Sequence, residues 1–315
     1  MHDVIVIGAG PAGLAAAAIA LHHHLKTLVI APDLAGKAAY RLQLPWLAER
    51  EYINGEETVA ALRQRLLTSP HVMRYLDTVE RVFIHDHAFQ VITSEGGAAR
   101  GRSMIVATGV RPRALGVPGE QRLHGYGVSY SATSHASLFA ERSVVVIGSD
   151  LRALRATADL LPIATRVTLI APDPAALHAL PLGQRLMQSG RSTVLAGWKV
   201  AEITGDQFVS GVIAIAPDGQ AHTLAANGVF IEQGLEAPID FLGELAACSD
   251  NGQIIVDANG ATSCAGLFAA GDITTSAHAE QILVALGEGA RAGLSAQAYL
   301  REGPDWLEER AYTAA

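Results

Sequence analysis

The chain has 315 residues, of which half are hydrophobic and 5% aromatic, and it carries a formal net charge of −8. A chain of this length is expected to form about two domains, and its composition is typical of an alanine- and glycine-rich α/β protein, which argues against disorder. The acidic balance argues against a nucleic-acid partner and against binding to an anionic membrane surface.

The first segment of the chain contains a glycine-rich turn between two apolar runs. In order, these are residues 4–7, the turn Gly8-Ala9-Gly10-Pro11-Ala12-Gly13, the alanine-rich residues 14–21, and the apolar residues 28–30. Strand, turn, helix and strand form the context in which a G-x-G-x-x-G motif binds a dinucleotide. Gly8 permits the tight turn, Gly10 lets backbone N–H groups approach a pyrophosphate, and Gly13 lets helix pack on strand. The N-terminus of the helix favours the negative charge of the phosphates.

The sequence predicts no membrane span, signal peptide or metal site. Residues 4–21 have the apolar length of a membrane span, but their glycines, proline and alanines make a poor one. The chain begins inside a predicted strand without a preceding basic segment, so a signal peptide fits no better. Cys248 and Cys264 have no metal-ligand spacing, and a reducing, cytoplasmic setting is the default. His22, His23 and His24 cannot converge on a metal, because consecutive helical residues point about 100° apart.

After the glycine turn the chain alternates between irregular segments and predicted strands. Residues 34–46 lack periodicity and are expected to form a long loop on the ligand side of the sheet. A helix is predicted over residues 56–67, and strands are predicted at 72–79, 81–84, 88–93 and 103–107. The last strand ends in Ala107-Thr108-Gly109, and the proline- and glycine-rich residues 111–119 predict a crossing linker.

Beyond the linker, a second unit repeats the spacing of the first. A strand is predicted at 144–147, a turn at Gly148, a helix at 152–161 and a strand at 167–170. A hairpin over residues 211–230 turns at Asp218-Gly219, and the chain then returns to the first domain, with a strand at 254–256. A long helix from Ala279 to Leu300 contains Gly287 and Gly289, which are expected to mark close packing against a neighbour.

These elements predict an α/β protein of two Rossmann-like nucleotide-binding domains with three-layer ββα architecture, the second inserted in the first. The expected boundaries are 1–117 and 243–315 for the first domain, and 118–242 for the second. The second resembles an NAD(P)-binding domain whose nucleotide motif is altered.

The order of motifs resembles that of the low-molecular-weight thioredoxin reductases, which carry FAD and NADPH in two domains. The resemblance covers nearly the whole chain and rests on Gly8 to Gly13, Ala107-Thr108-Gly109, Gly127-Val128-Ser129-Tyr130, Phe268-Ala269-Ala270-Gly271-Asp272, and Gln281 with Gly287-Glu288-Gly289. It implies FAD in the first domain and a homodimer.

The resemblance also implies which residues bind FAD. They are Gly8, Gly10, Pro11, Ala12, Gly13, Asp33, Gly36, Lys37, Val79, Ala107, Thr108, Gly109, Gly271, Asp272, Gln281 and Ile282. Asp272 would accept hydrogen bonds from sugar hydroxyls, or else cap a helix. The acid that usually holds the adenosine ribose is replaced by Ala31, so Asp33 either reaches the ribose or caps a turn. The helix beginning near Ala279 would direct its positive end toward the flavin.

The redox motif of the family is absent. Ser131-Ala132-Thr133-Ser134 stands where the family has Cys-x-x-Cys. Serine hydroxyls cannot store two electrons as a reversible S–S bond, so dithiol exchange at this position is excluded. Ser131, Ser134 and His135 are the remaining candidate catalytic residues, and His135 is either a proton carrier or a loop histidine without a role.

The glycine turn of the second domain is altered as well. It has the sequence Gly148-Ser149-Asp150-Leu151-Arg152-Ala153, which places a carboxylate where a pyrophosphate would approach. Such a like-charge contact costs on the order of a few kcal/mol, which Arg152 and Arg155 could offset in part. Residues 171–174 lack the arginines that usually hold a 2′-phosphate. NADPH is therefore not expected to bind in the usual manner.

The sequence thus predicts an FAD-dependent oxidoreductase that works without a dithiol and without NADPH. The resemblance suggests a ferredoxin-type electron donor, or a second FAD or other ligand in the second domain. One alternative is a ferredoxin/flavodoxin–NADP reductase, which requires a usable nicotinamide pocket. Another is a non-catalytic flavin-binding or sensory protein.

Overall fold

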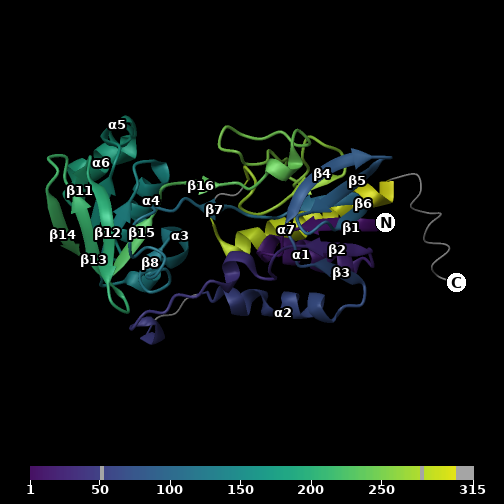
Figure 1. Ribbon diagram of the computed structural model, residues 1–315, viewed down its shortest axis with the longest axis horizontal. Coiled ribbons are helices and arrows are strands. Elements are labelled where there is room, and N and C mark those ends of the chain that lie inside the picture. The colour runs from purple at the N-terminus through teal and green to yellow at the C-terminus, as the bar shows by residue number, and fades with distance from the viewer. Residues whose placement is uncertain (50–52, 277–279, 303–315) are drawn as a thin grey trace. The chain divides into compact units, whose positions relative to one another are not determined.

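The computed structural model describes residues 1–49, 53–276 and 280–302, which form two compact units (Figure 1). Unit 1 comprises residues 1–40, 54–111 and the described residues from 236 onward; unit 2 comprises the described part of 41–53 and residues 112–235. The expected boundaries at 117/118 and 242/243 thus move to 111/112 and 235/236. The described residues between 41 and 53, expected in the first domain, pack with unit 2, where the Trp46 indole donates to the Leu138 carbonyl.

Unit 1 is built around one mixed sheet with the order β3-β2-β1-β6-β5-β4, in which β17 also pairs with β6. Its strands are β1 (His2–Ile7), β2 (Thr27–Ile30), β3 (Val72–Tyr75), β4 (Val79–His85), β5 (Ala88–Thr93), β6 (Ala98–Val106) and β17 (Leu267–Ala269). β1, β2, β3, β6 and β17 run parallel, whereas β4 to β6 form an antiparallel meander. Parallel pairing brings the carboxyl ends of β1, β2, β6 and β17 to the same edge of the sheet.

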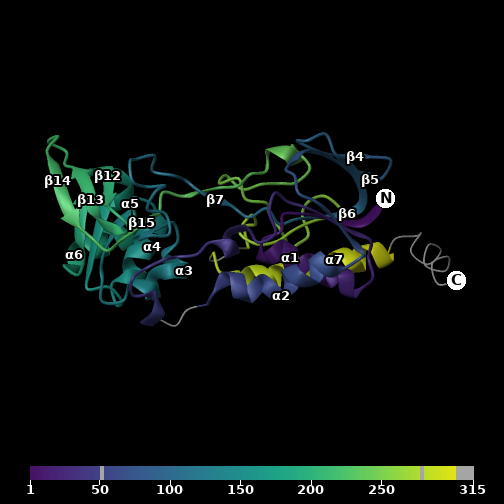
Figure 2. The same ribbon diagram turned by 60° about the horizontal axis from the view of Figure 1, so that its bottom comes forward.

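Residues 4–7 of β1 are all apolar and buried, because both faces of this sheet are covered. Val4 and Val6 pack into one buried cluster with the helices, and Ile5 and Ile7 pack into another with β4 and β5. Figure 2 shows α1 (Pro11–His22), α2 (Gly55–Thr68) and α7 (Ile282–Glu302) beside one another in this unit.

The contact between α1 and α7 requires glycine on α7. A Cβ atom at Gly289 would lie 2.0 Å from the carbonyl oxygen of Ala12. The prediction of close packing is confirmed at Gly289 but is wrong at Gly287, where no atom lies within 4 Å of the Cβ position among the described residues. The expected start of this helix, Ala279, lies outside the described residues.

Unit 2 contains a five-stranded parallel sheet, a three-stranded antiparallel sheet and short helices. The parallel sheet has the order β11-β10-β9-β15-β8, with β8 (Val128–Ser129), β9 (Ser143–Ile147), β10 (Arg166–Ala171), β11 (Thr193–Ala196) and β15 (Gly228–Ile231). The antiparallel sheet contains β12 (Lys199–Gly205), β13 (Val209–Ile215) and β14 (Ala221–Ala225). The helices are α3 (Ala132–His135), α4 (Leu151–Leu160), α5 (Pro174–Ala179) and α6 (Pro181–Ser189). The two crossings between the units, β7 (Arg111–Pro112) and β16 (Leu235–Glu236), pair with each other.

The predicted fold class is confirmed: the chain is α/β, with parallel, Rossmann-like sheets in both units. Three local predictions were wrong. The predicted strand 72–79 ends at Tyr75, and the predicted hairpin over 211–230 ends at Ala225 because β15 joins the parallel sheet beside β9. Ile254 makes isolated bridges and lies in no strand. None of the helices in the described ranges combines the length and apolar character needed to cross a bilayer.

Candidate functional site

The three glycines of the turn after β1 have different surroundings. Gly8 has a φ of +101°, and a Cβ atom there would lie 2.3 Å from the Ala107 carbonyl oxygen. A Cβ atom at Gly13 would lie 1.9 Å from the Gly8 carbonyl oxygen, but at Gly10 the Cβ position has no neighbour within 4 Å among the described residues. Gly8 and Gly13 are therefore required by packing within the protein. Gly10, the N-cap of α1, leaves room for a ligand at the positive end of the helix, and Pro11 and the buried Ala12 begin that helix.

The end of β6 adds a polar group to the same edge of the sheet. Ala107 is buried, and its N–H donates to the Ile7 carbonyl at 2.7 Å. The next hydroxyl, Thr108 Oγ1, is buried and has no hydrogen-bond partner among the residues that the structure describes. Gly109 follows with a φ of +66°. Buried polar atoms normally have a partner, so Thr108 fits a site that receives a polar ligand.

Asp33 shapes the loop after β2. Its Oδ1 accepts hydrogen bonds from the backbone N–H groups of Ala35 at 3.1 Å and of Gly36 at 2.6 Å. Of the two expected roles, the structure therefore shows the turn cap. The cap brings Gly36 to the glycine turn, where a Cβ atom on Gly36 would lie 3.2 Å from the Gly10 Cα.

Lys37 joins two carboxylates at this edge of unit 1. Its Nζ lies 2.6 Å from Asp272 Oδ2 and 2.7 Å from Glu280 Oε1. Burial alone would lower the pKa of Lys37, but the two carboxylates outweigh it and raise the pKa. Lys37 therefore remains a cation and offsets the charge of both acids.

Gly271 and Asp272 follow β17 and are tied to α7 by a buried glutamate. Glu288 Oε2 accepts from the Gly271 N–H at 2.8 Å, and Glu288 Oε1 accepts from Ser276 Oγ at 3.2 Å. Gln281 precedes α7, and its carbonyl accepts from the Ala285 N–H at 3.0 Å. Ile282 is the first residue of α7. The last predicted residue, Val79, is buried at the start of β4, on the face of the sheet opposite α1.

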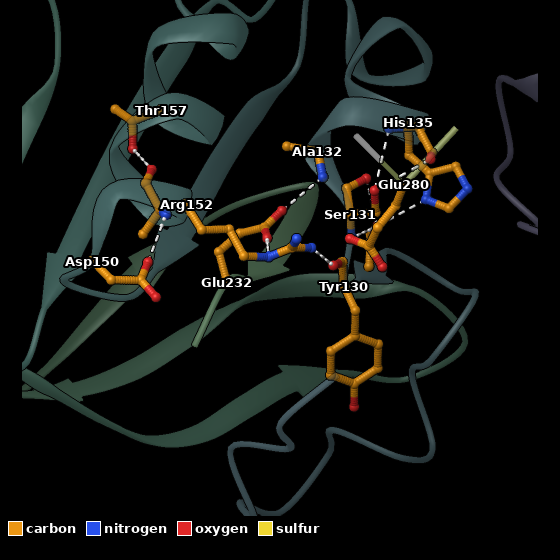
Figure 3. A network of polar contacts seen from close by, with 12 residues as sticks. Tyr130, Ser131, Ala132, His135, Asp150, Arg152, Thr157, Glu232 and Glu280 are labelled. Carbon is orange, nitrogen blue, oxygen red and sulfur yellow. Dashed lines mark hydrogen bonds and ion pairs between the residues drawn. The ribbon is translucent and has the colours of Figure 1, made fainter. Parts of the chain in front are cut away.

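In unit 2, Ser131 and Ser134 contact each other, and Figure 3 shows Ser131 close to His135. Ser131 caps α3: its Oγ accepts from the Ser134 N–H at 3.3 Å and donates to Ser134 Oγ at 3.2 Å. His135 Nδ1 lies 2.9 Å from Ser129 Oγ, which is buried. The three predicted catalytic residues thus lie on one helical turn. Hydroxyl groups and an imidazole can hold or move protons there, but they cannot exchange disulfides.

The two cysteines of the chain lie outside residues 131–134. Cys248 and Cys264 are both free thiols. Burial raises the pKa of each thiol, which lowers its thiolate fraction.

Tyr130, directly before the serines, donates its hydroxyl proton to Glu120 Oε1 at 2.8 Å. Glu120 is 2% exposed and also accepts from the N–H groups of Leu115 and Gly116 at 2.8 and 2.6 Å. Burial, and then the Glu120 carboxylate, raise the pKa of Tyr130 well above its ordinary value. The Tyr130 hydroxyl is therefore a proton donor that stays protonated.

This shift predicts a loss of stability in alkali. Above about pH 10 the unfolded chain releases the Tyr130 proton while the folded chain keeps it, so the free energy of unfolding should fall as the pH rises. Denaturant unfolding between about pH 9 and about pH 11 should show a steeper fall for the wild-type protein than for Tyr130→Phe. Parallel curves for the two proteins would contradict the assignment.

At the altered glycine turn of unit 2, side chains of the turn itself make hydrogen bonds and an ion pair with the protein (Figure 3). Asp150 is the N-cap of α4, and its Oδ1 accepts from the Ala153 N–H at 3.1 Å. Arg152 pairs with Glu232 and donates from Nη2 to the Tyr130 carbonyl at 2.8 Å. Arg152 is therefore directed to Glu232, and the expected compensation of Asp150 by this arginine is not shown.

Four glutamates have roles in the structure that no sequence motif predicted: Glu120, Glu232, Glu280 and Glu288. Glu232 had a signal, since it is an acid directly after the apolar run of β15. A sequence signal for Glu288 was also present, because it is an acid between two glycines of a helix rich in small residues.

Comparisons with known proteins show the family and the fold of the chain. The family model for pyridine nucleotide-disulphide oxidoreductases matches residues 2–289. An NADH dehydrogenase of Bacillus subtilis is 32% identical over 95% of this chain and 58% of its own length. The F component of an alkyl hydroperoxide reductase from Pseudomonas aeruginosa is 33% identical over 93% of this chain and 57% of its own length. The chain thus spans less than two thirds of these curated relatives.

Among solved structures, a thioredoxin reductase from Streptococcus pyogenes superposes with a TM-score of 0.85 at 28% identity, covering 96% of this chain and 99% of that one. A thioredoxin reductase from Giardia duodenalis gives a TM-score of 0.83 at 25% identity, covering 95% and 98%. With most of its length matched by the family model, the chain belongs to the pyridine nucleotide-disulphide oxidoreductase family of enzymes.

Proposed function

We propose that the protein is an FAD-dependent oxidoreductase that uses neither a dithiol at residues 131–134 nor NADPH. The observation that carries the flavin assignment is the open position at Gly10, at the N-terminus of α1, together with the buried Thr108 hydroxyl at the same edge of the sheet. The turn from Gly8 to Gly13 would hold the pyrophosphate with backbone N–H groups, and Asp272 would accept from sugar hydroxyls. FAD, when bound, supplies the electron-transfer chemistry.

Lys37 prepares this site electrostatically. Two carboxylates, Asp272 and Glu280, lie within 2.7 Å of the same ammonium group. Without Lys37, both would repel the phosphates of a dinucleotide and each other. The cation keeps the carboxylates available as hydrogen-bond acceptors without leaving a net negative charge of two.

The case against NADPH rests on the capping of two helices in unit 2. Asp150 supplies a carboxylate to the N-terminus of α4, where a pyrophosphate would otherwise approach. Asp173, in the segment that lacks the 2′-phosphate arginines, caps α5 by accepting from the Ala175 N–H at 2.9 Å. Asp150 and Asp173 thus place carboxylates where the pyrophosphate and the 2′-phosphate of NADPH would carry negative charge.

Replacing Asp150 with glycine should strengthen the binding of a nicotinamide dinucleotide to unit 2. The change removes the like charge and restores the second glycine of the motif, so we expect NADH to bind at least about tenfold more tightly. Glycine at an N-cap costs only a few tenths of a kcal/mol, so the fold should be retained. Titration calorimetry with NADH measures the gain. Asp150→Asn, which keeps a capping oxygen without the charge, should show a smaller gain; an unchanged Kd in both variants would refute the charge argument.

The electron donor is the second part of the proposal. We propose a ferredoxin-type donor, or a second flavin bound by unit 2. Anaerobic titration with reduced ferredoxin should bleach the flavin absorbance of the purified holoprotein, and an unchanged spectrum would reject this donor. The moles of FAD per chain decide between a ferredoxin-type donor and a second bound flavin, because a second flavin requires two FAD per chain.

We also propose a homodimer, which light scattering after size exclusion would test.

A pyridine nucleotide-driven reductase is the second candidate. It is favoured by the relatives named NADH dehydrogenase, which match 95% of this chain. NADH is therefore the nucleotide to test first, since the missing arginines disfavour NADPH specifically. Bleaching of the flavin within seconds of mixing wild-type protein with NADH would establish this function in place of the first.

A further inference from the structure

Charged side chains of unit 2 contact one short segment, residues 130–132, and Figure 3 shows two of them, Arg152 and Glu232. The carboxylates are Glu120 and Glu232, each 2% exposed, and the cation is Arg152, whose side chain is 24% exposed. Burial of charge is costly unless each group is paired and hydrogen-bonded. The arrangement therefore needs a reason beyond filling the core, which apolar residues fill elsewhere in this unit.

Each charged group holds a different atom of the segment. Glu120 Oε1 accepts from the Tyr130 hydroxyl at 2.8 Å, and Arg152 Nη2 donates to the Tyr130 carbonyl at 2.8 Å. Glu232 Oε1 accepts from the Ala132 N–H at 2.7 Å. Ser131 is therefore held from both sides, since the carbonyl before it and the N–H after it are both bound.

The three groups are themselves anchored on separate parts of unit 2. Glu120 is bound by backbone N–H groups of residues 115 and 116, Arg152 lies in the first turn of α4, and Glu232 directly follows β15. Arg152 and Glu232 also pair with each other. Segment 130–132 is thus fixed relative to a strand, a helix and a loop at once, which leaves it little freedom to change orientation.

We propose that Glu120, Arg152 and Glu232 form a clamp of positioning residues for Ser131 and, through its two hydrogen bonds, for Ser134. The clamp holds the two hydroxyls as a fixed surface for the electron acceptor, which would be recognised by hydrogen bonds to hydroxyl groups. The inference rests on the proposed function of an oxidoreductase, with Ser131 and Ser134, predicted from the sequence as catalytic residues, as the reacting surface. The positioning itself is testable without any turnover.

Hydrogen exchange of backbone amides in the full-length holoprotein tests the clamp. Glu232→Leu removes the acceptor of the Ala132 N–H, so exchange of that amide should accelerate at least about tenfold, as loss of a hydrogen bond to a charged group implies. Glu232→Gln keeps an oxygen at the same place and should restore protection to within about threefold of wild type. The amides of Leu169 and Ile170 in β10 report on opening of the whole unit and should not change.

Two outcomes would overturn the clamp. One is exchange of the Ala132 amide in Glu232→Leu within about twofold of wild type. The other is equal acceleration at Leu169 and Ile170, which would show general destabilisation only. If Glu232→Leu does not fold, Arg152→Gln/Glu232→Gln removes both charges without leaving one unpaired. It should accelerate exchange of the Ser134 amide about tenfold through loss of the Tyr130 contact, and unchanged exchange would reject the proposal.

A chemical readout separates positioning from a merely structural role. The thiol introduced by Ser131→Cys would accept a hydrogen bond from the Ser134 N–H. This hydrogen bond favours the thiolate form and lowers the pH at which the cysteine reacts with iodoacetamide. Adding Glu232→Leu should move that pH profile toward the profiles of Cys248 and Cys264, and adding Glu232→Gln should leave it in place. Coincident profiles in all three backgrounds would contradict the clamp. Neither readout uses an electron donor or an electron acceptor. The clamp can therefore fail while the flavin assignment holds, and the flavin assignment can fail while the clamp holds.

Discussion

Replacing Gly10 with valine should give a folded protein that retains less than about a tenth of the wild-type flavin. The backbone at Gly10 is extended, with φ −70° and ψ −175°, a conformation that valine adopts readily. Apart from its two chain neighbours, no described residue has an atom within 4 Å of the Cβ position, so the added Cβ atom meets open space. It would fill the space through which a pyrophosphate reaches the N-terminus of α1. Flavin absorbance per chain, measured after reconstitution with excess FAD, checks the result.

Gly13→Ala is the matched comparison, since it lies one helical turn away. Its Cβ atom would lie 1.9 Å from the Gly8 carbonyl oxygen, so the backbone of the turn must shift. We expect this variant to lose thermal stability together with flavin. Gly10→Val, in contrast, should have the same melting temperature as wild-type protein from which the flavin has been removed. Full flavin content in Gly10→Val would place the cofactor elsewhere and defeat the proposed function.

Replacing Ser131 and Ser134 together with cysteine should produce a reversible disulfide. Ser131 Oγ and Ser134 Oγ lie 3.2 Å apart, and Ser131 Oγ already accepts from the Ser134 N–H. Side-chain atoms this close can reach an S–S bond of about 2.05 Å after a small rotation of the side chains. Oxidised glutathione would take the two electrons, forming the S–S bond as two glutathione thiols are released. A thiol assay under denaturing conditions should then detect only Cys248 and Cys264.

The single variants are the controls for this experiment. Ser131→Cys and Ser134→Cys should each keep one additional thiol, or form a mixed disulfide with glutathione that mass spectrometry identifies. Reduction with dithiothreitol should restore both thiols of the double variant. If both thiols of the folded double variant remain free after oxidation, the two positions do not have the orientation that the structure gives them.

Several parts of the fold and site follow from local sequence rules. The glycine turn, the helix after it and the matching spacing of the second unit depend on backbone freedom and apolar periodicity, which neighbouring residues determine. The absence of a Cys-x-x-Cys motif at residues 131–134 is also visible directly, because Ser131 and Ser134 stand at its ends. The candidate FAD residues on the ends of β1, β2, β6 and β17 share one edge, as the parallel arrangement predicts.

Other features were decided only by tertiary contacts. Local rules left Asp33 with two roles, and the cap of the Gly36 turn became evident only once the backbone path was known. Lys37 and Glu280 lie far apart in the sequence, and the strand order of unit 1 brings them together. The same holds for Glu120 and Glu232, whose partners come from distant segments. The sequence by itself determined which kinds of nucleotide turn and redox motif the chain has. The tertiary structure decided which charges face each other, because that depends on contacts between residues far apart in the chain, which neither periodicity nor spacing encodes.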